Sequence, residues 1–249
     1  MSLDVAARLV RDARRVVVFT GAGVSAESGL PTFRSEDNAM WREVDVRNFA
    51  YPDGYRRNQP NAWRWYVQRA AAARRVEPNP GHYAIAELER RVEHFLLVTQ
   101  NIDGLHQRAG STNVLELHGS LRHVRCFDCG AYSEWPSGEA DPVCQACGGL
   151  LRPDVVFFEE GLPPGALEQA AAAARECDVL VSVGTSNVVW PATEIPRYAL
   201  RAGAHVIIVN KDMAGQPLGK RVLPLPGPSG EILPALVRLA FAAESRHRR

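Results

Sequence analysis

The sequence predicts an α/β fold, in which a Rossmann-like parallel sheet with helices on both faces carries a smaller inserted module. Short apolar runs typical of buried strands occur at 15–20, 95–99, 114–119, 179–184 and 204–210. Amphipathic helical patterns lie between several of these runs, at 81–92, 164–177 and 196–203. Strands that alternate with helices form parallel sheets whose two faces are both covered.

The predicted domain boundaries follow from the segments that break this alternation. Residues 30–80 are rich in Trp, Tyr, Arg, Asn and Pro, and residues 121–154 contain two cysteine pairs and many turn residues. We expect both segments to form one smaller inserted domain, with a helical module in the first segment and the cysteine pairs in the second. The Rossmann-like domain then consists of 1–29, 81–120 and 155–249.

Composition narrows the class of protein. The 249-residue chain is 46% hydrophobic and 23% charged, with a formal net charge of +1, as is ordinary for a soluble globular protein. This charge balance does not favour nucleic acid as a partner. No apolar run is long enough to span a membrane, and the N-terminal segment lacks a secretory signal. We therefore predict a cytoplasmic protein that binds neither nucleic acid nor membrane.

Four of the five cysteines follow the spacing C-x2-C-x14-C-x2-C, with a glycine after each pair. Four thiolates can form the closed tetrahedral shell of a structural zinc ion, so we predict one Zn²⁺ in a zinc ribbon. Four buried free thiols are the alternative. Cys177 stands apart at the end of a helical pattern, and we expect it in the core. The zinc ligands are then Cys126, Cys129, Cys144 and Cys147.

The turn after the first predicted strand has the character of a phosphate-binding turn with unusual spacing. Gly21, Gly23 and Gly29 give G-x-G-x5-G, and no acidic residue ends a second strand about twenty residues later, as a dinucleotide fingerprint requires. Backbone N–H groups in such a turn can hold phosphate, and the Ser25 hydroxyl can add to them. A tight structural turn is the alternative.

Polar side chains also follow other predicted strands. Gln100, Asn101 and Asp103 come directly after one strand, and His118 ends another. Ligands of parallel sheets lie beyond the carboxyl ends of the strands, where a neutral imidazole can serve as a general base. Two alternatives stay open at this point, because Asp103 suits a helix cap equally well and a lone histidine is often structural.

The motifs together point to one family. "GAGVSAESGLPTFR", "QNID", "HG", the two CxxC pairs and "GTSNVVWP" occur in this order along the chain. This combination resembles the sirtuin family, the NAD-dependent protein lysine deacylases, over about residues 5–235. The resemblance implies the fold and zinc module described above, NAD consumed as a co-substrate, and acyl-lysine proteins or peptides as substrates.

The resemblance also implies a reaction. The acyl oxygen of a modified lysine attacks C1′ of the nicotinamide ribose, and His118 deprotonates a ribose hydroxyl. The products are nicotinamide, free lysine and 2′-O-acyl-ADP-ribose. His118 and Asn101 are the implied catalytic residues. The implied NAD-binding residues are Gly21, Ala22, Gly23, Ser25, Phe33, Arg34, Gln100, Asn101, Ile102, Asp103, Gly184, Thr185, Ser186 and Asn210.

Within "PDVVFFEE" (153–160), Val156, Phe157 and Phe158 match the strand that binds the substrate peptide by backbone pairing. The family usually has Gly at the position of Glu159. This departure affects the local backbone geometry and the charge beside the peptide.

A further motif bears on the acyl group. Tyr66 and Arg69 lie three residues apart, on one face of a predicted helix. Their spacing resembles the Y-x-x-R of sirtuins that remove succinyl, malonyl and glutaryl groups, in which Arg pairs with a carboxylate. Ala50 occupies a position where that class keeps a small residue. Tyr51 replaces a usual Thr and is expected to narrow the pocket. A packed Tyr and a solvated Arg on an amphipathic helix are the alternative.

Two other functions remain open from the sequence. NAD-dependent protein mono-ADP-ribosyl transfer shares the cleavage of NAD, but its acceptor attacks C1′ directly. A non-catalytic zinc-ribbon protein that senses NAD is the second alternative. The sequence does not define the oligomeric state or the target proteins.

Overall fold

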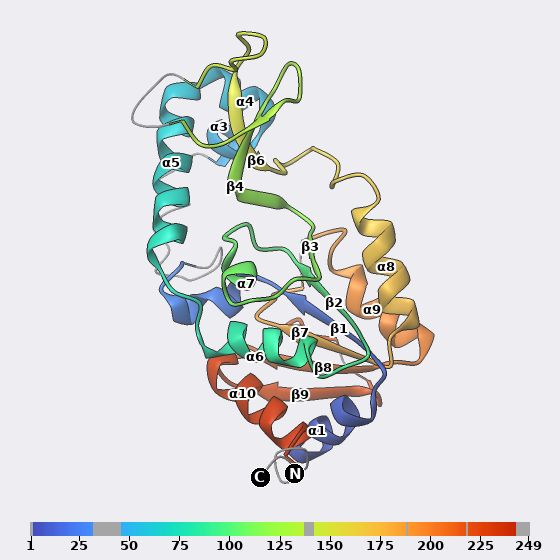
Figure 1. Cartoon of the computed structure of the whole chain (residues 1–249). Coiled ribbons are helices and arrows are strands. Elements are labelled where there is room, and N and C mark those ends of the chain that lie inside the picture. Colours follow the sequence, from blue (N-terminus) through green and yellow to red (C-terminus); the bar gives the residue numbers. More distant parts are fainter. Residues whose placement is uncertain (1, 32–45, 137–141, 188, 218, 243–249) are drawn as a thin grey trace.

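The computed structural model describes residues 2–31, 46–136, 142–187, 189–217 and 219–242 (Figure 1). Its larger sheet has six parallel strands in the order β3-β2-β1-β7-β8-β9. The strands are β1 (Arg15–Thr20), β2 (His94–Thr99), β3 (Val114–Glu116), β7 (Val179–Val183), β8 (His205–Asn210) and β9 (Val222–Pro226). The predicted parallel α/β sheet is therefore confirmed.

Helices cover both faces of this sheet. One face carries α1 (Ser2–Asp12), α6 (Pro80–Glu89) and α10 (Ser229–Ala240), and the other carries α8 (Ala166–Glu176) and α9 (Glu194–Ala202). Successive strand residues point to opposite faces. Val16 and Val18 accordingly pack in the first core, and Val17 and Phe19 pack in the second. The continuous apolar run of β1 is explained by burial on both sides.

Two elements differ from the sequence predictions. The predicted run 114–119 divides, because β3 ends at Glu116 and a strand of another sheet begins at Gly119. The strand that ends at Asn210 is not the last one, since β9 follows it at the edge of the sheet. β9 contains Pro224 and Pro226, which read as loop residues but are tolerated on an edge strand.

The smaller sheet lies at the other end of the molecule (Figure 1). It is antiparallel, in the order β5-β4-β6, with β4 (Gly119–Cys126), β5 (Tyr132–Ser133) and β6 (Leu151–Val155). Beside it lie α3 (Val46–Ala50), α4 (Pro52–Arg57) and α5 (Gln59–Arg75). A third core, which includes Tyr55, Tyr66 and Phe157, joins these helices to the sheet. The exact domain boundaries stay a prediction.

Two short elements connect the sheet to the site. The 3-10 helix η1 (Ala22–Ser28) follows β1, and α7 (Leu105–Arg108) follows β2. Within the described ranges, no helix combines the length and the apolar character that crossing a bilayer requires.

Candidate active site

A pocket of about 1440 Å³ lies between the strand ends of the large sheet and the elements of the small one. It is larger than most small-molecule pockets, which range from about 300 to 1,000 Å³. Phe33 and Arg34 lie outside the described residues. The other predicted catalytic, NAD-binding and substrate residues all line it: Gly21, Ala22, Gly23, Ser25, Ala50, Tyr66, Arg69, Gln100, Asn101, Ile102, Asp103, His118, Val156, Phe157, Phe158, Gly184, Thr185, Ser186 and Asn210.

The glycine turn after β1 packs against the turn after β7. The Gly21 N–H donates to the Val183 carbonyl at 3.0 Å, and the Gly23 N–H donates to the Gly184 carbonyl at 2.8 Å. A Cβ atom on Gly23 would lie 2.7 Å from the Gly184 backbone. These glycines therefore permit a close backbone approach. The N–H groups of these two glycines are donated within the protein, so the predicted phosphate contacts of this turn do not come from them.

The Ser25 side chain is the centre of a buried polar network. Its hydroxyl donates to Asp103 Oδ2 at 2.8 Å and accepts from Asn101 Nδ2 at 3.2 Å. His82 Nε2 lies 3.3 Å away on its other side. His82 Nδ1 accepts from the Asn79 N–H, so its Nε2 carries hydrogen and donates to Ser25. All hydrogen-bonding positions of the hydroxyl are thus used.

Burial sets the protonation of this network. Burial raises the pKa of Asp103, against bonds from Leu105 N–H and Ser25 that lower it. Asp103 Oδ1 also accepts from the N–H of Leu105, the first residue of α7, at 2.9 Å, so the same side chain bonds the helix start and lines the pocket. Burial lowers the pKa of His82 to about 4, which leaves this ring neutral near pH 7.

A second network surrounds Thr185. The Thr185 carbonyl accepts from Asn210 Nδ2 at 3.1 Å and from Gln216 Nε2 at 2.8 Å. The Thr185 hydroxyl accepts from Gln100 Nε2 at 3.1 Å. These bonds connect the ends of β2, β7 and β8 across the floor of the pocket.

His118 lies between the two sheets and faces the pocket. Its Nδ1 is 3.1 Å from the Gln100 carbonyl. A carbonyl only accepts, so Nδ1 carries the hydrogen and Nε2 keeps its lone pair. Burial lowers the pKa of His118, although the Gln100 carbonyl partly offsets this shift. The ring is therefore neutral near pH 7, with a basic nitrogen available at Nε2.

The opposite wall is aromatic and carries a cation. Tyr66 is only 4% exposed and contacts the rings of Tyr55, Trp65 and Phe157. Burial raises its pKa, so the phenol stays protonated. The Arg69 guanidinium stacks on Trp65 at 4.8 Å, and burial lowers its pKa. Within the described ranges, Arg69 has no carboxylate partner and the Tyr66 hydroxyl has no hydrogen bond.

The predicted substrate segment is a strand only as far as Val155, and a turn follows. The Val156 N–H donates to the His118 carbonyl at 2.9 Å, and the Phe158 N–H donates to the Ala50 carbonyl at 2.8 Å. Tyr51, which we expected to narrow the pocket, instead stacks on Phe158 at 5.3 Å. Among the described residues, Tyr51 does not contribute to the pocket lining.

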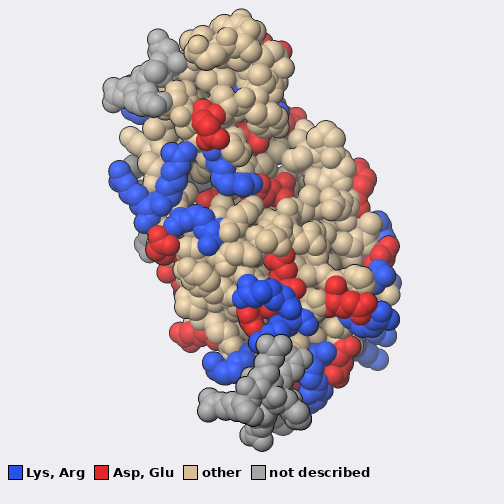
Figure 2. Space-filling model, viewed as in Figure 1, with Lys and Arg blue, Asp and Glu red and all other residues tan. Residues whose placement is uncertain are grey.

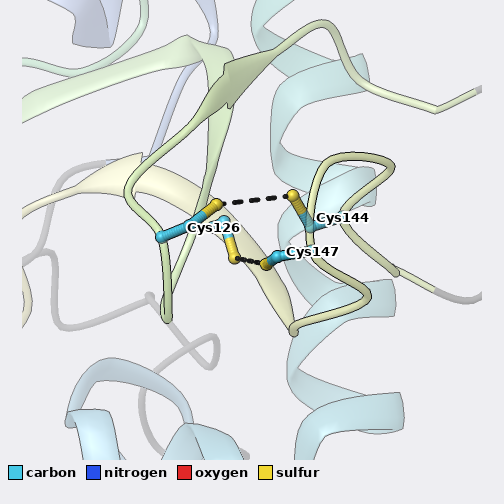
Figure 3. Close-up of side chains that lie close together, drawn as sticks. Cys126, Cys144 and Cys147 are labelled. Atoms are coloured by element: carbon cyan, nitrogen blue, oxygen red, sulfur yellow. Dashed lines mark hydrogen bonds between the residues drawn. The ribbon is translucent and has the colours of Figure 1, made fainter.

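The four predicted zinc ligands come together at the far end of the small sheet (Figure 3). Their Sγ atoms all lie within 4.8 Å of one another. Cys126 and Cys147 are 3.6 Å apart, and Cys129 and Cys144 are 3.7 Å apart. A tetrahedral ion with Zn–S bonds of about 2.3 Å separates its sulfurs by about 3.8 Å. The cluster therefore fits a closed Zn²⁺ site. Cys177, by contrast, is buried in the core beside α8.

Comparison with known proteins decides the family. The model of the Sir2 family matches residues 21–191, which include most residues of the pocket and the whole cysteine cluster. The chain belongs to the Sir2 family.

Relatives of this Sir2-family chain cover nearly its full length. NAD-dependent protein deacylase 1 of Pseudomonas aeruginosa is 48% identical over 246 residues, which are 94% of this chain and 97% of the relative. NAD-dependent protein deacylase 2 of Pyrobaculum aerophilum is 47% identical over 234 residues, 93% of each chain.

Solved structures agree with this fold. A Sir2 homologue in complex with NAD has a TM-score of 0.87 and 40% identity, covering 95% of this chain and 93% of its own. Sir2Af2 bound to a myristoylated histone peptide has a TM-score of 0.78 and 38% identity, covering 98% of both chains.

The sequence did not identify several residues of this Sir2-family pocket as site residues. Trp65, Leu162 and Trp190 line it, and His82 and Gln216 support it from behind. The aromatic residues stand in segments already assigned to the small domain or to a motif. His82 lies in a helix start, Asn-Pro-Gly-His, where a capping histidine cannot be told from a site residue.

Charges of both signs are distributed over the surface. On the face shown in Figure 2, basic and acidic side chains lie side by side over the lower part, whereas the upper end is mostly uncharged. Figure 1 places α3, α4 and the small sheet at this upper end. Individual charges that face the pocket are therefore more informative than the overall balance.

Proposed function

We propose that this protein is an NAD-dependent protein lysine deacylase. It uses NAD, water and an acyl-lysine to give nicotinamide, free lysine and 2′-O-acyl-ADP-ribose. The names of the relatives support this activity. The observation that carries the proposal is the neutral His118 imidazole, whose Nδ1 is fixed by Gln100 and which lines a pocket large enough for a dinucleotide.

His118 is the proposed general base. It takes a proton from a ribose hydroxyl of the bound nucleotide at Nε2, which activates that hydroxyl toward the acyl carbon. The Gln100 carbonyl can stabilise the resulting imidazolium through the Nδ1–H bond. A positioned general base typically increases the reaction rate by a factor of about 10² to 10⁴.

The wall at the strand ends is the proposed site of NAD. Asn101 and Asp103 are placed at the nicotinamide end, with Ile102 between them. The turn after β1 follows the phosphates, where its glycines allow close approach and Ala22 and Ser25 border the cofactor. The adenosine side is assigned to Gly184, Thr185, Ser186 and Asn210. A Sir2 homologue with the same fold in complex with NAD supports NAD as the ligand.

The segment after β6 is the proposed site of the substrate peptide. The N–H groups of Val156, Phe157 and Phe158 are all donated within the protein. A peptide that adds along this edge therefore pairs mainly with carbonyl oxygens. Sir2Af2 with its acylated histone peptide supports acyl-lysine peptides as the substrate class.

The proposed acyl preference is for succinyl and malonyl groups, with acetyl also accepted. A half-buried guanidinium that lacks a partner is costly, and a carboxylate can neutralise it with paired hydrogen bonds. Arg69 meets this description among the described residues, and the Tyr66 phenol beside it is free to donate. Ala50 is small and leaves room for the acyl chain.

The test uses one peptide that carries either acetyl-lysine or succinyl-lysine, incubated with and without NAD and followed by mass spectrometry. We expect both groups to be removed only with NAD, and succinyl faster. Arg69→Met should lower kcat/KM for succinyl-lysine about 30-fold, since one charged hydrogen-bonded pair contributes about 2 kcal/mol. Activity toward acetyl-lysine should change little.

The outcomes separate the parts of this proposal. If acetyl-lysine is removed faster by the wild type, the acidic-acyl preference is wrong and the deacylase stands. If neither group is removed although NAD binds, the deacylase proposal is wrong. A cytoplasmic location is part of the same proposal, and cell fractionation tests it.

A further inference from the structure

A tight turn follows the pocket-lining residue Phe157. The Glu160 N–H donates to the Phe157 carbonyl at 3.1 Å, and the Phe157 N–H donates to Glu160 Oε2 at 2.8 Å. The third residue of this turn is Glu159, whose φ is 69°. A positive φ at this position favours Gly, because a side chain there is strained. The sequence keeps a glutamate where the backbone would prefer glycine.

A buried ion pair holds this turn in place. Arg152 is 2% exposed, and its guanidinium bonds both carboxylate oxygens of Glu160 and the Val155 carbonyl. It also stacks on the Phe157 ring, 3.7 Å from the centroid. The charge of Glu160 is thereby neutralised within the protein, and the position of its neighbour Glu159 is fixed.

Glu159 itself has no such partner. It is exposed, lines the pocket, and forms no hydrogen bond or ion pair with any residue in the described ranges. From Val155 to Ala174 the chain contains no Lys or Arg, so this rim carries no cation of its own. Phe158, Leu162 and Pro163, which line the pocket in the same segment, are apolar.

We propose that Glu159 is a specificity-determining residue that pairs with a cationic side chain of the substrate, close to the acyl-lysine. This inference rests on the proposed deacylase function and names its substrate class, a basic peptide segment. Glu159 and Arg69 line the same pocket with opposite charges. Arg69 then binds the acyl group, and Glu159 binds a cationic side chain of the peptide that carries it.

The test uses three peptides with the same acyl-lysine, flanked on both sides by Arg, Ala or Glu. The acyl group is whichever of acetyl and succinyl the wild type removes faster. We expect kcat/KM about threefold higher for the Arg peptide than for the Ala peptide, and lower still for the Glu peptide, as for one exposed charge pair. Higher salt should reduce this preference.

Two substitutions isolate the residue. Glu159→Gln removes the charge and should abolish the preference while keeping turnover of the Ala peptide. Glu168→Gln is the matched control, because Glu168 lines the same pocket from α8 and is also exposed. If the control loses the preference to the same extent, a general field causes it and the role of Glu159 is overturned.

Glu159→Gly removes the charge and the strained side chain together. We expect an unchanged or higher midpoint of thermal unfolding with the preference lost, which excludes misfolding as the cause. Equal turnover of the three peptides by the wild type overturns the role of Glu159 alone. Absence of turnover of all three, including the neutral one, overturns the deacylase proposal on which it rests.

Discussion

The two walls of the pocket differ in how many of their polar side chains are hydrogen-bonded within the protein. At the strand ends, the Ser25 hydroxyl has three side-chain partners, and the Thr185 carbonyl accepts from two side chains. On the wall formed by α5 and the turn after β6, Tyr66, Arg69 and Glu159 have no polar partner among the described residues. These strand-end groups are hydrogen-bonded without a ligand, whereas the three side chains on the other wall have no such bonds within the described residues.

This difference indicates a division of labour. Groups that are already hydrogen-bonded are held in one geometry, as a reaction requires of the residues that position its substrates. Groups without partners gain most from a ligand that supplies them, so they discriminate among ligands. The acyl and peptide preferences can therefore change while the strand-end wall stays as it is.

The largest effect is expected from His118→Ala. Loss of the proposed base should lower kcat for deacylation about 1,000-fold, with the acyl preference of the residual activity unchanged. In the wild type, kcat/KM should fall as the pH drops through the pKa of His118, which burial places below its ordinary value. Initial rates of lysine deacylation, followed by mass spectrometry of the peptide across pH, measure both.

Comparison of deacylation with ADP-ribosyl transfer, which involves no acyl group, makes this test more specific. Transfer of ADP-ribose to a protein nucleophile does not need the same base. If His118→Ala deacylates at nearly the wild-type rate, the assignment of the base is wrong. If it retains NAD-dependent modification of a protein but not deacylation, the transferase is the better description.

The next largest expected effect is a loss of stability at low pH. His82 supports the strand-end wall, and its folded pKa of about 4 lies below the ordinary value near 6.5. The unfolded chain binds a proton that the folded one does not, so the stabilising effect of neutral His82 is lost as pH falls from about 6.5 toward 4. We expect the free energy of unfolding to drop by about 2 kcal/mol between pH 7 and pH 4.5 from this residue.

Urea unfolding at the two pH values measures this drop. His82→Gln, which does not titrate in this range, should show a smaller drop than the wild type. Buried His106, 4.8 Å from His82 between ring centroids, accounts for part of what remains. Tyr66 on the opposite wall should not contribute, because its phenol stays uncharged across this range. An equal drop in both proteins would exclude His82 as the acid-sensitive group.

The sequence predicts the two walls unequally. Apolar runs locate the central strands, and the residues that directly follow them must share one edge of a parallel sheet, as Gln100 and Gly184 do. The cysteine spacing likewise identifies the metal cluster. The family resemblance adds the roles of residues such as Tyr66, which no periodicity distinguishes from a core tyrosine.

What the sequence leaves out are contacts between distant segments. The approach of Gly23 to Gly184, the bond from His82 to Ser25 and the clamp of Arg152 on Glu160 all depend on the assembled fold. Edge strand β9 is hidden by its prolines, which become acceptable only once its position in the sheet is known.

Substitution of one hydroxyl on each wall should give effects of equal or smaller size. Ser25→Ala removes a group with three partners and leaves buried polar atoms unpaired, so the free energy of unfolding should fall by about 2 kcal/mol. Tyr66→Phe removes a hydroxyl with no partner in the described chain, so stability should change by less than about 0.5 kcal/mol. Denaturant unfolding of both variants measures these changes.

The two substitutions should also differ in their effect on acyl preference, which only Tyr66→Phe should change. Tyr66→Phe should lower kcat/KM for succinyl-lysine about fivefold and leave kcat/KM for acetyl-lysine unchanged, because only the succinyl group carries a terminal carboxylate that can accept from the phenol. Ser25→Ala should affect both acyl groups equally, because its network borders the proposed site of NAD. If Tyr66→Phe is instead as destabilising as Ser25→Ala, its hydroxyl is part of the folded framework, and the contrast between the walls does not hold.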